Sequence, residues 1–271
     1  MSLPCAQSVD FEMSAQRSWK EFWEAKAATH VSDFEFDRGT SPRDPEMELL
    51  SQVELLDFID ARPTDTLLDA GCGTGANILL LHSRVDRIIA MDYASAAVER
   101  CRKRLAAHGI VNAEVLQGEI SATNLPDASV DRILCMSVLQ YIDDEQVRSA
   151  FREFARVLRG RGTLVLHAKN LCSLYLSTLW LTKRLFLALN KETKLEYFRT
   201  FDWYVKELTA AGFRIETYRS LNVLMLERMP RRLVLWLQRI ELSHQAKWPL
   251  SSALLRRLGS DLKLRAQLAA R

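Results

Sequence analysis

Three closely spaced glycines and the acidic residues around them are the first residues in this chain whose types and spacing could bind a ligand. The run LDAGCGTG, residues 68–75, follows a short apolar stretch and leads into a helical pattern. Glycine has no Cβ atom, so the backbone N–H and C=O groups of such a loop can approach a ligand closely. Gly71-x-Gly73-x-x-Ala76 also satisfies the loose dinucleotide fingerprint, and a nicotinamide cofactor is therefore one alternative for this loop.

Two aspartates near the loop bear on the kind of ligand. Asp69 stands two residues before Gly71, where a carboxylate would attract an ammonium or sulfonium group and repel a pyrophosphate. Asp92 ends the second predicted strand, 17 residues after Gly75, and could accept hydrogen bonds from both hydroxyls of a ribose. Both have a structural alternative: Asp69 could cap a turn, and Asp92 could be the N-cap of the helix that begins at Ser95.

A third group of candidates includes residues that follow the third predicted strand. Glu119 could accept a hydrogen bond from an adenine amino group, and Tyr93 and Ile120 could lie on the two faces of the ring. A solvated turn is the alternative interpretation of Glu119. Taken in order, the first aspartate, the glycine loop, the second aspartate and this third group favour S-adenosylmethionine over a dinucleotide.

The order of these motifs resembles the UbiE-like group of class I S-adenosylmethionine-dependent methyltransferases, the type 11 methyltransferase domain, over residues 66–168. The resemblance implies that the three glycines, Gly71, Gly73 and Gly75, contact the methionine part of S-adenosylmethionine. It also implies that Asp92 binds the ribose and that S-adenosylhomocysteine is the product.

The resemblance extends to the adenine and acceptor sides of the site. Glu119 matches the position at which this family usually carries the aspartate that faces the adenine. The run CMSVLQY, residues 135–141, matches the stretch after the fourth strand, which in the family lines the floor between cofactor and acceptor. The resemblance thus places Cys135 beside the cofactor and Gln140 and Tyr141 in the acceptor pocket, although a core residue is the more ordinary interpretation of this cysteine.

Catalysis of methyl transfer makes limited demands on the protein, because the sulfonium cofactor supplies the activation. The protein must align the acceptor, exclude water and, for a hydroxyl acceptor, remove a proton. His167 ends the fifth predicted strand and is the candidate general base, with a purely structural histidine as the alternative. Trp19 and Trp23, which form one helical stripe with Phe22, either close over the cofactor and acceptor or pack against the domain.

Short apolar runs that alternate with amphipathic helices must position these residues. They predict an α/β fold with a doubly wound, mostly parallel seven-stranded sheet, Rossmann-like as in class I methyltransferases, with N-terminal helices and a helical cap formed by insertions. The expected strands are Thr66–Ala70, Arg87–Met91, Ala113–Leu116, Asp131–Met136, Thr163–His167, Phe213–Tyr218 and a last, half-exposed strand marked by the alternation of Leu262, Leu264, Ala266 and Leu268. The expected helices are Ala76–His82, Ser95–His108, Asp144–Leu158 and Phe201–Ala211.

Two regions lie outside this alternation. Residues 1–62 are predicted to be an N-terminal helical lid segment, with the aromatic stripe and a second helix at Glu46–Ile59. Residues 63–271 are predicted to be the methyltransferase domain, interrupted by cap insertions at about 170–200 and 221–259. The insertions are rich in Leu and Trp with interspersed basic residues, so they could cover a hydrophobic acceptor, rest on anionic lipid or form a subunit interface.

Composition excludes some classes of function. Across 271 residues, 37 basic and 34 acidic side chains give a net charge of +3, which offers no global case for nucleic-acid binding. The five cysteines form no CxxC pair, and Cys135 stands where catechol-type enzymes need a carboxylate for magnesium, so no metal site is predicted. We expect a cytoplasmic protein, because its cysteines are predicted to be free thiols and no signal peptide is recognisable. Lys183-Arg184 interrupts the most apolar stretch, so no transmembrane helix is expected, although peripheral membrane contact stays an option. The oligomeric state is expected to be a monomer or a homodimer.

The sequence therefore predicts an enzyme that transfers a methyl group from S-adenosylmethionine to a small or lipid-like, hydrophobic metabolite or natural product, at an oxygen atom. Two other hypotheses stay open at this stage. An NAD(P)-dependent oxidoreductase would use the same glycine pattern, although Asp69 argues against it. A cofactor-binding domain without activity could act as an assembly partner.

Overall fold

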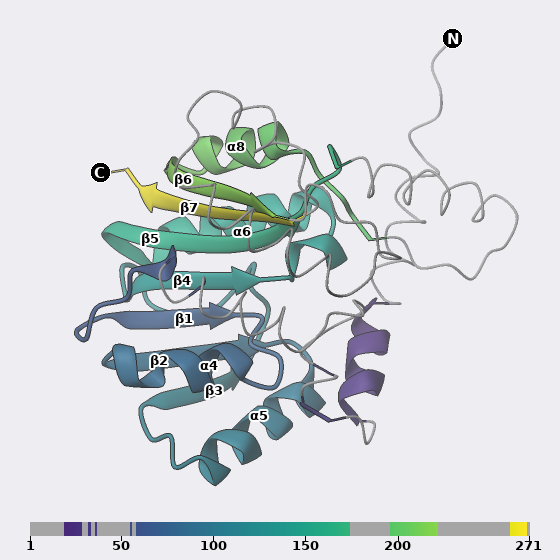
Figure 1. Cartoon of the computed structure of the whole chain (residues 1–271), viewed down its shortest axis with the longest axis vertical. Helices are drawn as coiled ribbons and strands as arrows, with labels where there is room; N and C mark the ends of the chain where they lie inside the picture. Colours follow the sequence, from purple (N-terminus) through teal and green to yellow (C-terminus); the bar gives the residue numbers. More distant parts are fainter. Residues whose placement is uncertain are drawn as a thin grey trace, which may run out of the picture.

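The computed structural model describes residues 19–28, 32–33, 36, 55, 58–173, 196–221 and 261–269. Within them, one seven-stranded sheet has the strand order β3-β2-β1-β4-β5-β7-β6 (Figure 1). β7 runs antiparallel to both of its neighbours and the other neighbouring pairs are parallel, which confirms the predicted mostly parallel sheet. The strands are β1 (Thr66–Ala70), β2 (Arg87–Asp92), β3 (Ala113–Gln117), β4 (Val130–Met136), β5 (Leu158–Lys169), β6 (Phe213–Leu221) and β7 (Asp261–Leu268).

The central strands have the continuous apolar character that a sheet covered on both faces requires. β1 reads TLLDA and β2 reads RIIAMD, and Leu67, Leu68 and Ile88 have no exposed surface. Their predicted bounds agree with the structure for β1 and differ by one residue for β2, β3 and β4.

The helices begin where the sequence provides local stabilisation. Asp143 and Gln146 form a capping box at the start of α6: the Asp143 carboxylate accepts from the Gln146 N–H at 2.8 Å, and the Gln146 side chain accepts from the Asp143 N–H at 3.1 Å. Thr200 caps α8 by accepting from the Trp203 N–H at 3.1 Å. The helices are α4 (Ala76–Leu81), α5 (Ser95–Ala107), α6 (Asp144–Val157) and α8 (Phe201–Ala210), with short 3₁₀ helices η1 (His82–Arg84) and η2 (Leu139–Tyr141).

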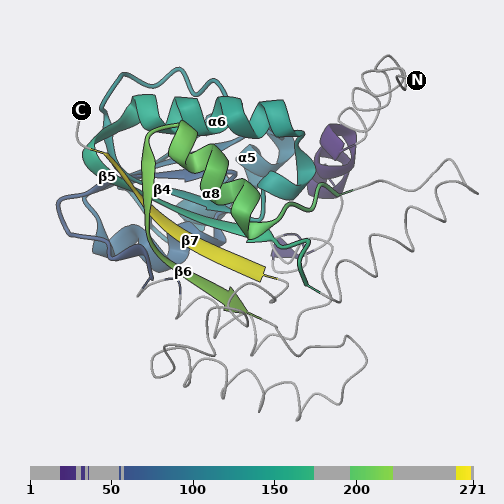
Figure 2. The same ribbon diagram turned by 90° about the horizontal axis from the view of Figure 1, so that it is seen from above.

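Helices cover both faces of the sheet. Phe151 of α6 and Tyr204 of α8 are buried in one cluster with Leu166 of β5, and Figure 2 shows α6 and α8 lying side by side on that face. Ile78 of α4, together with buried residues of α5, belongs to a second cluster with Val165 of β5. Because consecutive strand residues point to opposite faces, the two clusters lie on opposite sides of the sheet, as a doubly wound fold requires.

The junction between α6 and β5 differs from the sequence prediction. α6 ends at Val157 and β5 begins at Leu158, whereas the predicted strand began at Thr163. Leu158 pairs with Val130 of β4, with an irregularity in the ladder before Arg132. Residues 159–162 read RGRG, a charged and glycine-rich pattern typical of a turn, so the sequence did not indicate this extension of the strand.

The prediction of a half-exposed last strand is wrong. Its alternation is correct, since Leu262 and Leu264 point into the cluster under α6 and α8. However, Asp261 and Lys263 on the other face are only 3% and 1% exposed. The reason is that β7 lies inside the sheet, between β5 and β6, and its polar side chains meet partners there instead of solvent.

Several predicted features lie mostly or wholly outside the described residues. Of the second N-terminal helix, Glu46–Ile59, only Leu55, Phe58 and Ile59 are described, and they are helical and buried. Residues 174–195 and 222–260, which make up most of the two cap insertions, are not described. In the part of the chain that is described, no helix has the length and apolar character needed to cross a membrane.

Candidate functional site

The glycine loop connects β1 to α4 at the carboxyl edge of the sheet. All three glycines have positive φ, with 87° at Gly71, 54° at Gly73 and 90° at Gly75. The N–H groups of Gly71 and Cys72 donate to the carbonyl of Met91, at 2.8 and 2.9 Å, which ties the loop to the end of β2. A Cβ atom on Gly71 would lie 2.2 Å from Cγ2 of Val138, so the loop packs closely against the segment after β4.

Asp92 is held by backbone donors on two sides. Its Oδ2 accepts from the Gly73 N–H and its Oδ1 from the Ala94 N–H, each at 3.0 Å. Burial raises the pKa of Asp92 above its usual value, and these hydrogen bonds oppose the rise. The N-cap of α5 is Ala94, which has no side-chain capping bond, so the structure does not support Asp92 as the cap. Each carboxylate oxygen keeps lone-pair capacity for one further donor, as two ribose hydroxyls require.

Asp69 lies beneath the glycine loop. It belongs to β1, the strand between β2 and β4, and its side chain is nearly fully buried. Asn77 of α4 approaches Oδ1 of Asp69 through its amide nitrogen at 3.5 Å. A buried carboxylate in this position supplies negative charge to a cationic ligand above the loop.

The residues predicted to surround an adenine meet the N-terminal helix, residues 19–28. Lys20 forms an ion pair with Glu119 at 3.1 Å and lies 5.6 Å from the ring centroid of Tyr93. The Tyr93 hydroxyl donates to the carbonyl of Trp19 at 3.3 Å, and burial raises the pKa of that hydroxyl. Ile120 is buried beside Glu119 in the chain. Figure 1 shows this helix in purple, beyond the carboxyl ends of the strands.

The aromatic stripe and the floor residues form one cluster. The ring of Tyr141 lies 4.7 Å from that of Trp19 and 5.1 Å from that of Trp23, centroid to centroid. Gln140 is 3% exposed, and among the described residues its Oε1 has no hydrogen-bond partner. The structure therefore brings the rings of Trp19, Trp23 and Tyr141 together, and Gln140 is buried next to Tyr141 in the chain.

Cys135 does not lie with these residues. It has no exposed surface and belongs to the core cluster under α6 and α8. Burial raises the pKa of its thiol well above the usual value. The structure thus supports the core interpretation of Cys135, and its placement beside the cofactor stays a prediction.

His167 belongs to a chain of polar side chains that joins three strands. Its Nδ1 lies 2.8 Å from Oγ of Ser137, directly after β4, and its Nε2 lies 3.0 Å from Oδ1 of Asp261 in β7. Lys169 donates to the same oxygen of Asp261 at 2.6 Å. Since a carboxylate only accepts, Nε2 of neutral His167 carries the proton and Nδ1 accepts from the Ser137 hydroxyl.

Sequence reasoning missed Ser137 and Asp261 as site residues. Ser137 lies within the run 135–141 but carries no signal of its own, apart from standing at the carboxyl end of a strand. Asp261 opens the last alternating strand, and only the position of β7 beside β5 brings it to His167.

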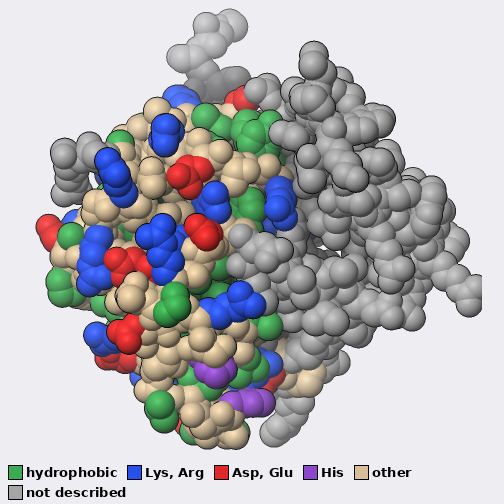
Figure 3. All heavy atoms as spheres, turned by 60° about the vertical axis from the view of Figure 1, so that its left-hand side comes forward, with side chains coloured by type: hydrophobic (Ala, Val, Ile, Leu, Met, Phe, Trp, Pro, Cys, Tyr) green, Lys and Arg blue, Asp and Glu red, His purple; other side chains and the backbone are tan. Residues whose placement is uncertain are grey.

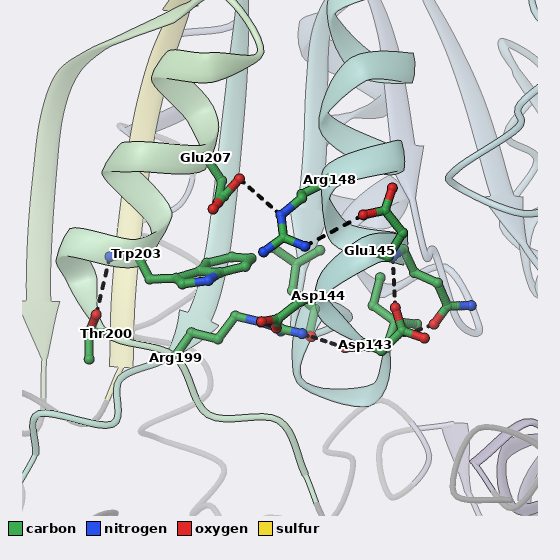
Figure 4. Close-up of polar contacts among 11 residues, drawn as sticks. Asp143, Asp144, Glu145, Arg148, Arg199, Thr200, Trp203 and Glu207 are labelled. Atoms are coloured by element: carbon green, nitrogen blue, oxygen red, sulfur yellow. Dashed lines mark hydrogen bonds and ion pairs between the residues drawn. The ribbon is translucent and has the colours of Figure 1, made fainter. Parts of the chain in front are cut away.

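Arg199 is another residue that the sequence did not indicate. Its guanidinium donates to the carbonyls of Leu139 and Ile142, at 2.6 and 2.7 Å, and to Oδ1 of Asp144 at 2.6 Å. The same group lies 4.8 Å from the ring of Trp203 (Figure 4). These contacts hold η2, which carries Gln140 and Tyr141, against the segment that leads into α8.

Charged side chains of both signs are mixed on the face of the described part that Figure 3 shows. Among the described residues no three His, Cys, Asp or Glu side chains gather as metal ligands would.

Comparisons with known proteins show similarity to methyltransferases. Residues 67–162 match the family described as "Methyltransferase domain". A probable S-adenosylmethionine-dependent methyltransferase of Mycobacterium tuberculosis is 33% identical over 151 residues, covering 54% of this chain and 48% of that protein. A malonyl-[acyl-carrier protein] O-methyltransferase of Serratia marcescens is 33% identical over 132 residues, covering 48% of this chain and 49% of that protein. The chain thus spans about half the length of these curated relatives.

Solved structures extend the similarity in fold beyond the matched segment. A phosphoethanolamine N-methyltransferase of Haemonchus contortus, in complex with phosphoethanolamine and S-adenosylhomocysteine, has a TM-score of 0.65 and 14% identity. The alignment covers 96% of this chain and 50% of that one. At 14% identity, this comparison supports similarity of fold only.

Proposed function

We propose that this chain, whose residues 67–162 are a class I S-adenosylmethionine-dependent methyltransferase domain, transfers a methyl group from S-adenosylmethionine to a small-molecule acceptor. The cofactor of this domain class is S-adenosylmethionine, which leaves as S-adenosylhomocysteine. The observation that carries the proposal is the arrangement of Asp92, whose two oxygens are each held by one backbone N–H beside the glycine loop.

The residues at the loop fit the chemical groups of the cofactor. Asp69 supplies buried negative charge below the loop, where the methionine ammonium and the sulfonium would lie. Asp92 can accept from both ribose hydroxyls, and Tyr93 and Glu119 stand beside it for the adenine. We assign Gly71, Gly73 and Gly75 to the methionine part of the cofactor on the family resemblance.

The alternatives lose support to different degrees. An NAD(P)-dependent oxidoreductase is disfavoured by the methyltransferase domain match and by Asp69, whose charge would repel a pyrophosphate. A domain that binds the cofactor without activity remains the competing proposal. Release of S-adenosylhomocysteine with an acceptor separates it from an enzyme.

The acceptor that we propose is an apolar molecule methylated at oxygen. The aromatic cluster of Trp19, Trp23 and Tyr141 offers apolar surface beside η2, and the first insertion leaves the sheet at the carboxyl end of β5, where open α/β sheets bind their ligands. The similarity to a malonyl-[acyl-carrier protein] O-methyltransferase supports oxygen as the methylated atom. His167 is the proposed base. Four further points remain predictions: membership of the UbiE-like subgroup, a cytoplasmic location, peripheral membrane contact, and a monomeric or dimeric state.

Calorimetry with S-adenosylmethionine, S-adenosylhomocysteine and NADH tests the proposal. We expect both sulfur compounds to bind without added metal, and tighter binding of NADH would contradict the proposed function.

Asp92→Ala removes the acceptor of two hydrogen bonds, so it should weaken cofactor binding by about 2–4 kcal/mol. Asp86→Ala, an exposed aspartate before the amino end of β2, is the matched control and should bind like the unmodified protein. An unchanged Kd for Asp92→Ala with intact circular dichroism would assign Asp92 to the fold alone.

A further inference from the structure

We propose that Ser137, His167 and Asp261 form a proton relay that deprotonates a hydroxyl acceptor, with Ser137 as the catalytic residue that contacts it. The proposal rests on the methyl-transfer function above and adds two residues and a class of acceptor to it. Its basis is a continuous chain of hydrogen bonds: 2.8 Å from Ser137 Oγ to His167 Nδ1, and 3.0 Å from His167 Nε2 to Asp261 Oδ1.

The exposure of the three residues sets the direction of the relay. His167 and Asp261 are each 3% exposed, whereas Ser137 is only half-buried. Of the three residues, Ser137 is therefore the one with exposed surface that an acceptor could contact. Asp261 orients His167 so that Nδ1 faces the serine, and the His167 ring in turn orients the serine O–H bond.

Ser137 also stands beside the cofactor loop. The next residue, Val138, lies so close to Gly71 that a Cβ on that glycine would clash with it. The Ser137 N–H donates to the carbonyl of His167 at 3.2 Å, and its φ of 59° is unusual for a residue other than glycine. Backbone held in this region is found disproportionately at active sites, where it fixes the direction of a side chain.

The charged groups named around His167 come from its own strand, β5, and from the neighbouring strand β7. Lys169 of β5 forms an ion pair with the Asp261 carboxylate, and that carboxylate is also the acceptor next to Nε2 of His167. Lys263 of β7 is paired in register with His167, and paired residues of an antiparallel ladder share a face. The carboxylate of Asp261 can accept from Nε2 of His167 in both protonation states of the ring, and Lys263 places a positive charge on the same face of the sheet.

The proposed step conserves atoms and charge. The acceptor oxygen forms a bond to the methyl carbon as the carbon–sulfur bond breaks, and the bonding pair stays on sulfur to give neutral S-adenosylhomocysteine. The acceptor proton moves to Oγ of Ser137 as the serine proton moves to Nδ1 of His167. To reset the relay, Nδ1 of the imidazolium gives its proton to Oγ of Ser137 as the serine O–H proton passes to water, which carries away the one proton released by the reaction.

This chemistry selects a class of acceptor. A hydroxyl group is a weak nucleophile until its proton is removed, so it gains from a relay. A carboxylic acid arrives ionised at neutral pH and needs no base. A relay at this position therefore indicates a hydroxyl acceptor, and loss of the relay should spare methylation of a carboxylate.

An acceptor-independent measurement tests the relay first. Nitrogen NMR of the His167 imidazole, in the full chain with S-adenosylhomocysteine and at alkaline pH, should show Nε2 protonated and Nδ1 unprotonated. Asp261→Asn should alter this tautomer balance. An unprotonated Nε2 would overturn the proposal, whichever acceptor the protein uses.

Turnover gives the second test, with naphthol as the hydroxyl probe and naphthoic acid as its carboxylate counterpart. Ser137→Gly removes the hydroxyl and suits the positive φ, and His167→Gln keeps a polar side chain of similar length. Each should lower kcat for naphthol by about 100-fold or more, while kcat for naphthoic acid and the Kd for S-adenosylmethionine are unchanged. His108→Gln, on an exposed histidine, is the matched control.

The possible failures are distinguishable. Equal kcat for naphthol in Ser137→Gly and the unmodified protein would overturn the relay but leave methyl transfer intact. Methylation of naphthoic acid alone would overturn the hydroxyl class. Failure of the unmodified protein to bind S-adenosylmethionine would instead contradict the proposed function.

Discussion

At the scale of single residues, Gly71 shows how closely the glycine loop packs against the segment after β4. Its φ of 87° and the position of Val138 leave no room for a side chain. Gly109, at the end of α5, has a φ of 65° but nothing within 4 Å of a Cβ atom. Both glycines thus have a positive φ, but only Gly71 has a neighbouring side chain where a Cβ atom would lie. Substitutions at the two positions can therefore be compared as a matched pair.

We predict that Gly71→Ala lowers stability and cofactor affinity more than Gly109→Ala does. Both substitutions place alanine in the left-handed region, at a cost of roughly 1–2 kcal/mol in the free energy of unfolding. Gly71→Ala must in addition displace Val138, so its Tm should be lower and its Kd for S-adenosylmethionine higher by at least about tenfold. Gly109→Ala should leave that Kd unchanged. Equal Tm and Kd values for the two variants would show that the contact with Val138 is easily relaxed.

At the scale of elements, Glu153 and Arg156 attach α6 to the loop between β3 and β4. The Glu153 carboxylate accepts from the N–H and the hydroxyl of Thr123, at 2.7 and 2.6 Å, and pairs with Arg156 at 2.8 Å. Arg156 donates to the carbonyl of Leu125 at 2.7 Å and pairs with Asp127. The loop that follows Glu119 and Ile120 is therefore anchored to a helix rather than left to its own conformation.

The pKa of Glu153 makes this anchor testable. The Arg156 guanidinium, together with the donors of Thr123, lowers that pKa from 4.5 to about 2. A carboxylate with a lowered pKa contributes stability above its unfolded-state pKa, and the contribution is lost as pH falls from about 4.5 to about 2. Glu153→Gln should therefore reduce the free energy of unfolding by about 1.5–3 kcal/mol at pH 7, and the difference should shrink below about pH 4.5.

Urea denaturation at several pH values measures this difference. Glu145→Gln is the control on the same helix, because its ion pairs with Arg148 and Arg152 are exposed and should contribute little. A difference for Glu153→Gln that stays constant from pH 7 to pH 3 would point to lost packing instead of lost charge.

At the scale of the whole molecule, segments far apart in sequence meet at the carboxyl edge of the sheet. The helix at residues 19–28 reaches Glu119 and Tyr93, and the first insertion begins and ends at residues that are paired with each other. Asn170 and Arg199 form a parallel bridge, and the Leu171 N–H donates to the Arg199 carbonyl at 3.0 Å. The insertion is thus closed at its base by the described residues.

We predict that residues 174–195 can be replaced by a short Gly-Ser linker without loss of the fold or of cofactor binding. Because the bridge and the Arg199 contacts lie outside the deletion, Tm and the Kd for S-adenosylmethionine should change little. Methylation of an apolar acceptor should be lost if this insertion covers it. The assay is S-adenosylhomocysteine release, with calorimetry as the control for an intact cofactor site. Full turnover by the shortened chain would remove the insertion from the acceptor pocket.

The sequence by itself determined most elements and the proximity of Asp69, the glycine loop and Asp92. The strands of the parallel half are apolar runs between turn residues, so their bounds follow from local pattern. In a parallel sheet the carboxyl ends of neighbouring strands share an edge, so Asp69, the glycine loop and Asp92 were bound to meet once those strands were recognised.

Tertiary structure alone decided which distant residues meet at His167 and at Glu119. Asp261 reaches His167 across 94 residues of chain, and Lys20 reaches Glu119 across 99. An alternating pattern shows that a strand has two unlike faces, but it does not specify which strand lies beside it. Insertion of β7 between β5 and β6 buried a face that alternation predicted to be exposed, and it converted a lone histidine into one member of a hydrogen-bonded chain. Pairing of distant strands depends on packing and hydrogen bonds that form only in the assembled sheet.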